Sequence, residues 1–154
     1  MTDTTTNISS DKESPPWLIQ FKEVYENLTK HNLESLGLIY DDNICFEDPI
    51  HKVVGYADVI AYFDDVYSNV ASCKFEIYHF IGTPTEAAVY WNMHFQHPKL
   101  KSGEKISIMG HSHLKATDNK IIYHRDYYDL GEMLYENIAV LGNLIKFLKK
   151  RTHQ

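Results

Sequence analysis

The segment CKFEIYHFI, residues 73–81, decides the fold, because the hydrophobic pattern changes there from a helical period to an alternating one. Alternation of apolar and polar side chains is typical of a strand that buries one face. Further strands are indicated around Trp91 and over residues 105–117 and 120–130. Asp118-Asn119 predicts a tight hairpin between the last two. The second half of the chain is therefore expected to form a four-stranded antiparallel meander.

Helical periodicity governs the first half of the chain. Pro15-Pro16 suits the first turn of a helix, and apolar residues then recur at three- and four-residue steps as far as Leu28. A short helix is expected over residues 33–40 and a longer one over 56–70, with a short strand that ends at Asp48-Pro49 between them. This order predicts an α+β fold. Long strands twist and curl, so we expect a cone-shaped sheet with the N-terminal helices over a hydrophobic pocket.

Length and composition fit one domain over residues 16–151, preceded by a polar tail over 1–15 that we expect to be disordered. The 154 residues are 44% hydrophobic and carry a net charge of −6. An acidic surface repels phosphate backbones, so nucleic-acid binding is not expected. No run approaches the roughly 18 apolar residues of a membrane span, and the start lacks a secretory signal. With Cys45 and Cys73 interpreted as buried free thiols, we expect a cytoplasmic protein without stable membrane insertion.

Several short motifs carry a resemblance to a known family: Tyr40-Asp41-Asp42, Phe46-Glu47-Asp48-Pro49, Gly55 and Tyr62-Phe63. They resemble a pattern of the nuclear transport factor 2-like superfamily, which includes ketosteroid isomerase and the SnoaL-like polyketide cyclases. The run from His124 to Asp129 is similar to an uncharacterised bacterial branch of it. The resemblance implies a cystatin-like α+β roll that works without metal or organic cofactor. The fold hosts isomerases, dehydratases, cyclases, epoxide hydrolases and binding modules, so it does not fix the reaction.

Asp48 is the first catalytic candidate. It ends a short strand between apolar neighbours, which disfavour the charged form of a carboxylate and make it a stronger base. By resemblance it matches the base aspartate of ketosteroid isomerase, which moves a proton between carbons next to a carbonyl. The alternative is that Asp48 only caps the turn after it, as an aspartate before proline commonly does.

His111, Asp126 and His124 are the next candidates. His111, His113 and Met109 share one face of a predicted strand. By an ungapped count from the hairpin, His124, Asp126 and Tyr128 fall on pocket-facing positions of the last strand. By resemblance, His111 stands where ketosteroid isomerase keeps a protonated aspartate, a departure that argues against steroid isomerisation. A histidine near a late aspartate is more similar to the polyketide cyclases. The alternative is a buried polar network that only orders the pocket.

Other pocket residues are expected around these. Tyr25 lies near the position of a phenol in the oxyanion hole of ketosteroid isomerase, although a tyrosine on an apolar helical stripe is more often part of the core. Tyr128 is expected to face the pocket with Asp126, and Trp91, Met109 and His113 complete the expected substrate-binding set. Which face of the Trp91 strand points inward stays open at this stage.

Nine histidines raise the possibility of a metal site. His111 and His113 with His124, or His94 with His97, could supply nitrogen ligands. His94 and His97 lie on opposite faces of their strand, and the enzymes that the chain resembles use no metal. We therefore expect neither a metal nor a cofactor.

Two surfaces suggest partners. Ile106, Ile108 and Leu114 form an apolar strand face that we interpret as the uncovered back of the sheet, which predicts a homodimer through the sheet. The C-terminal run LIKFLKKR, residues 144–151, is apolar on one side and basic on the other. It favours a last helix that docks on the domain, with contact to an anionic membrane surface as the alternative.

Three functional hypotheses follow. In the first, the chain is a cofactor-independent isomerase or lyase for a small apolar carbonyl compound. Asp48 or Asp126 removes a proton, and His111, His124 or Tyr25 stabilises the enolate oxygen. In the second, the same pocket is a non-catalytic binding module for a small molecule or lipid. In the third, the polar pocket residues only hold the fold.

Overall fold

Helix α1 (Pro16–Glu26) begins at the prolines that the sequence pattern marks. The computed structural model describes residues 14–151, so the tail expected over residues 1–15 lies, except for its last two residues, outside the described part. A 3₁₀ helix, η2 (Leu33–Leu38), takes the place of the short α-helix expected there. The longer helix, α2 (Tyr56–Asn69), follows Gly55, whose φ of 96° favours glycine.

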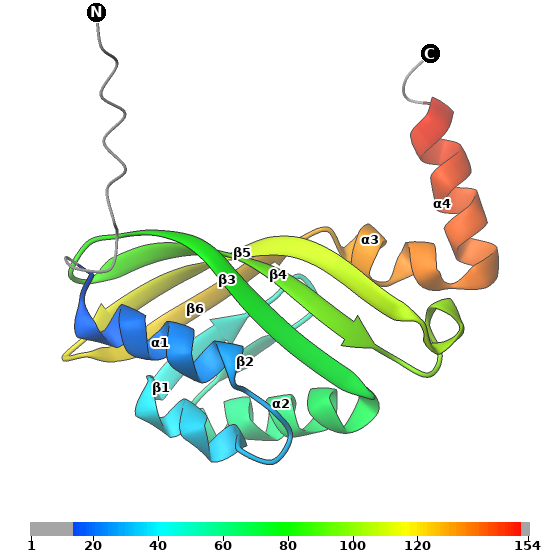
Figure 1. Ribbon diagram of the computed structural model, residues 1–154. Coiled ribbons are helices and arrows are strands. Elements are labelled where there is room, and N and C mark those ends of the chain that lie inside the picture. Colours follow the sequence, from blue (N-terminus) through cyan, green and yellow to red (C-terminus); the bar gives the residue numbers. More distant parts are fainter. Residues whose placement is uncertain (1–13, 152–154) are drawn as a thin grey trace, which may run out of the picture.

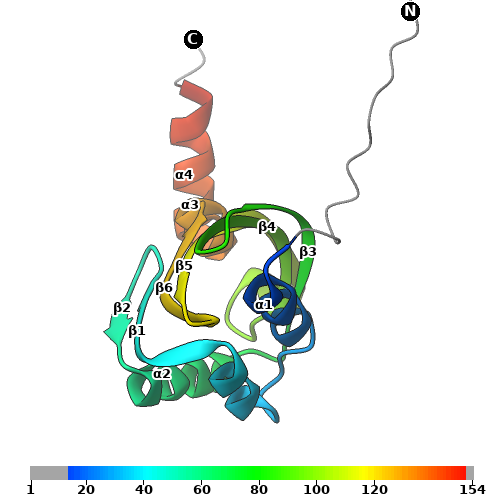
Figure 2. The same ribbon diagram turned by 90° about the vertical axis from the view of Figure 1, so that its left-hand side faces the viewer.

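Six strands form one sheet in the order β2-β1-β6-β5-β4-β3 (Figure 1). They are β1 (Tyr40–Glu47), β2 (Lys52–Val54), β3 (Ser72–Gly82), β4 (Glu86–Gln96), β5 (Lys105–Thr117) and β6 (Lys120–Tyr128). The antiparallel meander from β3 to β6 is confirmed. β1 pairs parallel with β6, so the sheet is mixed and not purely antiparallel. Figure 2 shows the meander curling around α1 with α2 below β1, which confirms the curled α+β fold.

The hollow side of the sheet holds the core. The apolar stripe of α1 packs into it, and β4 turns Val89, Trp91 and Phe95 inward, which settles the face that the sequence left open. Burial of large apolar side chains on one face of a curled sheet is the main stabilising contribution here. The helices therefore close one side of the cone and leave its interior lined by side chains.

The face assignment predicted for β5 is wrong. Ile106, Ile108 and Leu114, interpreted as the uncovered back of the sheet, are buried in the core. His111 and Met109 lie on the outer face instead, and Met109 is 69% exposed. The strand thus follows the ordinary rule that its apolar face points inward.

A β-bulge in β6 explains why the pairing of β5 with β6 differs from an ungapped count of residues from the hairpin. Lys115 pairs with Tyr123 and Ala116 pairs with Ile121, so Ile122 has no partner in the β5–β6 ladder. Because side chains alternate between the two faces, one extra residue in β6 shifts every later pair by one position. Asp126 consequently stands opposite Ser112 rather than opposite His111.

The C-terminal segment departs from the expected docked helix. A short helix, α3 (Leu130–Met133), and a 3₁₀ turn, η4 (Tyr135–Asn137), lead into α4 (Ala139–Arg151). In Figures 1 and 2, α4 projects away from the sheet. Its apolar side chains are exposed, so the expectation that this helix docks on its own domain is wrong.

The outer face of the sheet carries aromatic and imidazole side chains. Tyr90 of β4, His111 of β5 and Tyr127 of β6 are cross-strand neighbours, with ring centroids 5.6 Å and 4.9 Å apart. Tyrosine and methionine are enriched in protein interfaces. A homodimer through this face stays a prediction, but it now rests on Tyr78, Met109 and Tyr127 and not on Ile106, Ile108 and Leu114.

Substitution Met109→Glu tests the dimer. We expect the wild-type chain to lose mass on dilution in light scattering, and the variant to be monomeric at the same concentrations, because a charge would be buried in the interface. Lys30→Glu, at an exposed position outside the sheet, serves as a charge control. A strictly monomeric wild-type chain at micromolar concentration contradicts the prediction.

Substitution Gly110→Ala tests the packing of β4 on β5. A Cβ atom at Gly110 would lie 2.3 Å from the ring of Trp91, so the ring has to move. Overpacking of this kind is expected to lower the free energy of unfolding by about 1–3 kcal/mol, measured by urea denaturation. Met109→Ala, at the exposed neighbour, is expected to stay within about 0.5 kcal/mol of wild type. Equal stability of Gly110→Ala and wild type contradicts this packing.

Candidate functional site

A cavity of about 390 Å³ lies between the hollow side of the sheet and helices α1 and α2. Its walls are mostly aromatic and aliphatic: Phe46, Phe63, Phe75, Trp91, Met93, Phe95, Leu100, Met133 and Leu134. Its polar lining residues include Asp48, Tyr62, Asp126 and Tyr128, together with Tyr25, His51, Asp65, Tyr67, Asn69, Cys73 and His97. An apolar cavity with few convergent polar groups is the usual form of a small-molecule site.

Asp126 is held from behind by two donors. Ser112 Oγ donates to its Oδ1 over 2.5 Å, and His124 Nε2 lies 2.7 Å from the same oxygen. Trp91 Nε1 donates to Ser112 Oγ over 2.9 Å, which fixes the direction of the hydroxyl. Within residues 14–151, Oδ2 accepts no hydrogen bond. One carboxylate oxygen is therefore anchored, and the other is left for a ligand in the cavity.

His124 is fully buried and connects Asp126 to two tyrosines on the other side of the site. A carboxylate can only accept, so Nε2 carries the proton and Nδ1 is the acceptor. Tyr40 Oη lies 2.7 Å from Nδ1, and Tyr25 Oη lies 2.6 Å from Tyr40 Oη. The chain of donors thus runs from Tyr25 through Tyr40 and His124 to Asp126. It is a satisfied network in which each member orients the next.

Asp48 has both of its oxygens occupied. Oδ1 accepts the backbone N–H groups of Ile50 and His51, each at 2.7 Å, which is the turn cap considered from the sequence. Oδ2 accepts the hydroxyl of Tyr62. Asp48 lines the cavity, but its hydrogen bonds leave it less available than Asp126 for proton transfer.

Two phenols of the cavity stay protonated at neutral pH. Burial raises the pKa of Tyr128 well above its usual value, and the negative charges of Asp48 and Asp126 raise it further. Burial also raises the pKa of Tyr62, together with its hydrogen bond to Asp48. Tyr62 already donates to Asp48, whereas the Tyr128 hydroxyl makes no hydrogen bond within residues 14–151. Tyr128 is thus an O–H donor that is available to a ligand in the cavity.

Cys73 also lines the cavity, where burial raises the pKa of its thiol to about 11. Cys73 is therefore a neutral thiol at neutral pH, whereas the nucleophilic form of a cysteine is the thiolate. Its side chain is thus an uncharged part of the cavity wall. Both cysteines are half-buried free thiols, less buried than the sequence suggested.

Most of the predicted site residues lie at the cavity, and the others lie on the outer face of the sheet. Asp48, Asp126, Tyr25, Tyr128 and Trp91 all line the cavity, with His124 directly behind Asp126.

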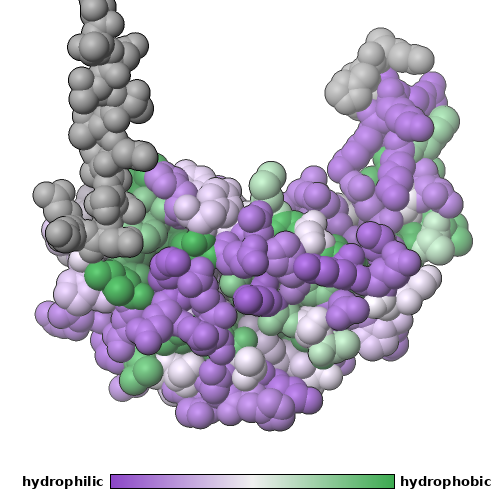
Figure 3. Space-filling model, viewed as in Figure 1, coloured by the Kyte–Doolittle hydropathy of each residue, from purple (hydrophilic) through white to green (hydrophobic). Residues whose placement is uncertain are grey.

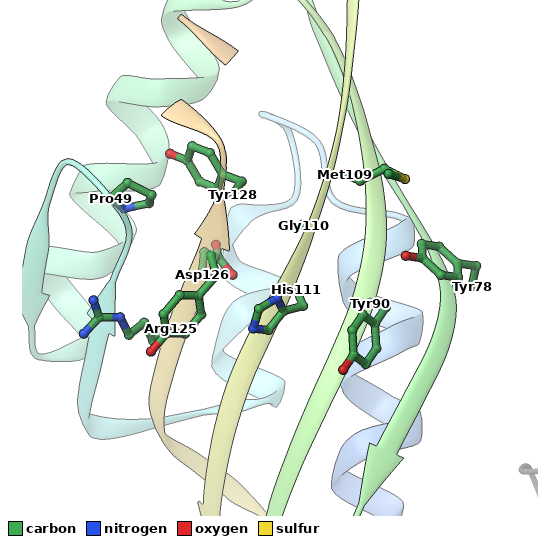
Figure 4. Close-up of a pocket in the computed structure, with 10 residues that line it drawn as sticks. Pro49, Tyr78, Tyr90, Met109, Gly110, His111, Arg125, Asp126 and Tyr128 are labelled. Carbon is green, nitrogen blue, oxygen red and sulfur yellow. The ribbon is translucent and has the colours of Figure 1, made fainter. Parts of the chain in front are cut away.

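The remaining three lie elsewhere. His111, His113 and Met109 are on the outer face of β5, so their predicted places in the pocket are wrong. His113 contacts Glu86 there, and His111 stacks on Tyr127. Figure 4 shows His111 and Met109 beside Tyr78 and Tyr90. They line a more open hollow of about 600 Å³, which Asp126 and Tyr128 also line.

Three residues of the site were missed from the sequence. Ser112 would have been found by turning the apolar face of β5 inward, because it alternates with Ile108 and Leu114. Tyr62 belongs to the pattern that carries the resemblance but was counted only as part of a helical stripe. Tyr40 was assigned to the end of a short helix, and nothing local in the sequence connects it to His124, 84 positions later.

The histidine sets considered for a metal do not converge. His124 faces inward, whereas His111 and His113 face outward. His94 Nδ1 lies 2.7 Å from Ser107 Oγ and its Nε2 lies 3.2 Å from Glu76. Among the described residues, no group of three or more histidine, cysteine or acidic side chains is arranged to hold a metal ion.

Comparison with known proteins identifies the family. Residues 21–124 match the SnoaL-like domain, and the chain belongs to this family. A search of curated proteins found no match.

Solved structures agree on the fold. A protein from Shewanella putrefaciens CN-32, assigned as a SnoaL-like polyketide cyclase, is 22% identical with a TM-score of 0.66, over 79% of this chain and 95% of that one. A second such protein, from Jannaschia sp. CCS1, is 10% identical with a TM-score of 0.70, over 80% and 92%. A Catenulispora acidiphila protein of ketosteroid isomerase-like fold, solved with trimethylamine, is 11% identical with a TM-score of 0.69, over 80% and 93%. At these identities the likeness shows the nuclear transport factor 2-like fold alone.

The buried phenols predict a loss of stability in alkali. Burial raises the pKa of Tyr25 and Tyr40 well above their value of about 10 in the unfolded chain. Because the folded-state pKa values are the higher ones, their stabilisation is complete below about pH 10 and is lost as the pH rises further. We expect the urea midpoint to fall as the pH rises above about 10. The fall should be shallower for Tyr25→Phe, and Tyr78→Phe, on the exposed face, should follow wild type; a flat wild-type profile contradicts the prediction.

Proposed function

We propose that this chain is a cofactor-independent isomerase or lyase that removes a proton next to the carbonyl of a small apolar compound, with Asp126 as the base. The observation that carries the proposal is the asymmetry of the Asp126 carboxylate. Its Oδ1 is anchored by Ser112 and His124, and its Oδ2 has no partner among residues 14–151 and belongs to a side chain that lines the cavity. A base is effective when it is oriented before the substrate arrives.

The remaining groups fit the same step. As Asp126 Oδ2 takes the proton from the α-carbon, the C–H electron pair moves into the carbon–carbon bond and the carbonyl oxygen becomes an enolate. The Tyr128 hydroxyl can donate to that oxygen, and its raised pKa keeps the proton on the phenol. Return of the proton to another carbon gives an isomer, whereas departure of a β-substituent gives an elimination. His124 is a positioning residue in this proposal, because it acts through Asp126.

The size and lining of the cavity support an apolar substrate of modest size. A volume of about 390 Å³ with aromatic walls fits one or a few fused rings. Structural neighbours assigned as SnoaL-like polyketide cyclases are consistent with a carbonyl compound. The aromatic walls equally favour a second candidate, a carrier that binds such a compound without converting it.

Deuterium exchange separates the two candidates. The probe is 1-indanone in deuterated buffer, and the measurement is loss of its α-proton signal by NMR. We expect exchange above the buffer rate with wild type and a reduction of about 100-fold or more with Asp126→Asn, since general bases contribute 10²- to 10⁴-fold. Tyr128→Phe is expected to cost about tenfold to 100-fold, from the loss of one hydrogen bond to a charged oxygen.

Matched controls distinguish chemistry from folding. His111→Ala, on the outer face, is expected to exchange at the wild-type rate, and circular dichroism checks that each variant is folded. Binding of 2-naphthol, followed by fluorescence, reports the cavity itself. Binding in all variants without exchange above the buffer rate in any would refute the proposed catalysis and support the carrier.

A further inference from the structure

Helix α4 is the largest feature that the cavity does not explain. It follows α3 and η4 and projects from the body of the domain (Figures 1 and 2). Among residues 14–151, no helix is long and apolar enough to cross a membrane, and α4 is no exception.

The first turns of α4 pack closely against η4, which fixes the direction of the helix. The amide of Gly142 donates to the Ile138 carbonyl over 2.6 Å, and a Cβ at Gly142 would lie 2.3 Å from the backbone oxygen of Glu136. Only glycine allows the helix to approach η4 this closely. Lys149 contacts the Glu136 carboxylate and lies 3.6 Å from that of Asp129. These contacts hold the helix at one angle to the domain.

One side of α4 is apolar and uncovered. Positions 140, 144 and 148 recur at four-residue steps, and 141 and 147 flank them, which sets five apolar side chains on one side of the helix. Val140 is 84% exposed, and the other four are Leu141, Leu144, Phe147 and Leu148, all exposed. Figure 3 shows hydrophobic residues along one edge of the projecting helix, beside a largely hydrophilic near side. A contiguous exposed apolar face of this kind marks an interaction surface.

The charge of α4 is opposite to that of the chain. The helix carries Lys146, Lys149, Lys150 and Arg151 and no acidic residue, although the chain as a whole has a net charge of −6. An apolar face bordered by basic side chains is the pattern of helices that lie in an anionic lipid interface. Two copies of α4 packed face to face would bring like charges together, which disfavours a second copy as the partner.

We propose that α4 is a peripheral docking helix that lays its apolar face into an anionic lipid surface. The contacts between α4 and η4 then fix how the acidic body is oriented toward the lipid surface. Met133 and Leu134 line the cavity just before η4, so docking by α4 brings that side of the cavity near the lipid. The proposal is independent of the chemistry proposed for Asp126, because it uses none of the same residues.

Vesicle co-sedimentation of the full chain tests the proposal. The vesicles are phosphatidylcholine with about one third phosphatidylglycerol, compared with phosphatidylcholine alone. We expect wild type to partition onto the anionic vesicles and the double variant Lys146→Glu/Lys150→Glu to lose about tenfold or more. Leu144→Ser/Leu148→Ser should lose a similar amount, because the apolar face supplies the rest of the affinity.

Matched controls lie on the body of the domain. Lys30→Glu/Lys74→Glu reverses two exposed lysines, and Leu38→Ser/Ile81→Ser replaces two exposed apolar residues; both should bind within about twofold of wild type. Equal partitioning of wild type onto neutral vesicles, or unchanged partitioning of Lys146→Glu/Lys150→Glu, overturns the proposal. So does a wild-type oligomer that Leu144→Ser/Leu148→Ser converts to monomer without any vesicle binding, since a second copy then covers the face.

Discussion

A single unpaired residue in β6, Ile122, sets the register on which both the core and the candidate site depend. With the bulge, Asp126 faces Ser112 across the ladder, and Ser112 lies on the same face as Ile108 and Leu114. The Asp126 carboxylate and the Ser112 hydroxyl that donates to it therefore both point into the apolar interior. Without it, every pair beyond the bulge would shift by one and Asp126 would face His111. The stability of the sheet and the order of the site thus rest on one local irregularity.

Much of the fold could be predicted from periodicity. The change at residues 73–81 marked the start of the meander, and the prolines before Trp17 marked the first helix. The faces of β5 were also available, because Ile106, Ile108 and Leu114 carry a plain inward pattern. A count of residues from the hairpin predicts the opposite faces, because a bulge leaves no clear mark in the sequence. The parallel pairing of β1 with β6 depends on contacts across some 80 residues, which periodicity does not report.

The site was predicted in part for the same reason. Asp126, His124 and Tyr128 lie at alternate positions of one strand, so identifying one inward position identified all three. Tyr40 and Tyr62 come from other elements and reach the site only through the tertiary fold. Asp48 illustrates a further limit, since one side chain both caps a turn and lines the cavity. A motif indicates where a carboxylate lies but not which of its oxygens is free.

The parallel pairing of β1 with β6 has a consequence for the order of folding. β1 ends at Glu47 and can pair with β2 soon afterwards, but β6 is complete only at Tyr128, so a chain leaving the ribosome holds β1 without β6 until late in its synthesis. The helices can form early from local contacts, whereas the Tyr40–His124 hydrogen bond must close a loop of more than half the chain. The candidate site is therefore among the last parts of the molecule to assemble, and a chain interrupted before β6 has no site at all.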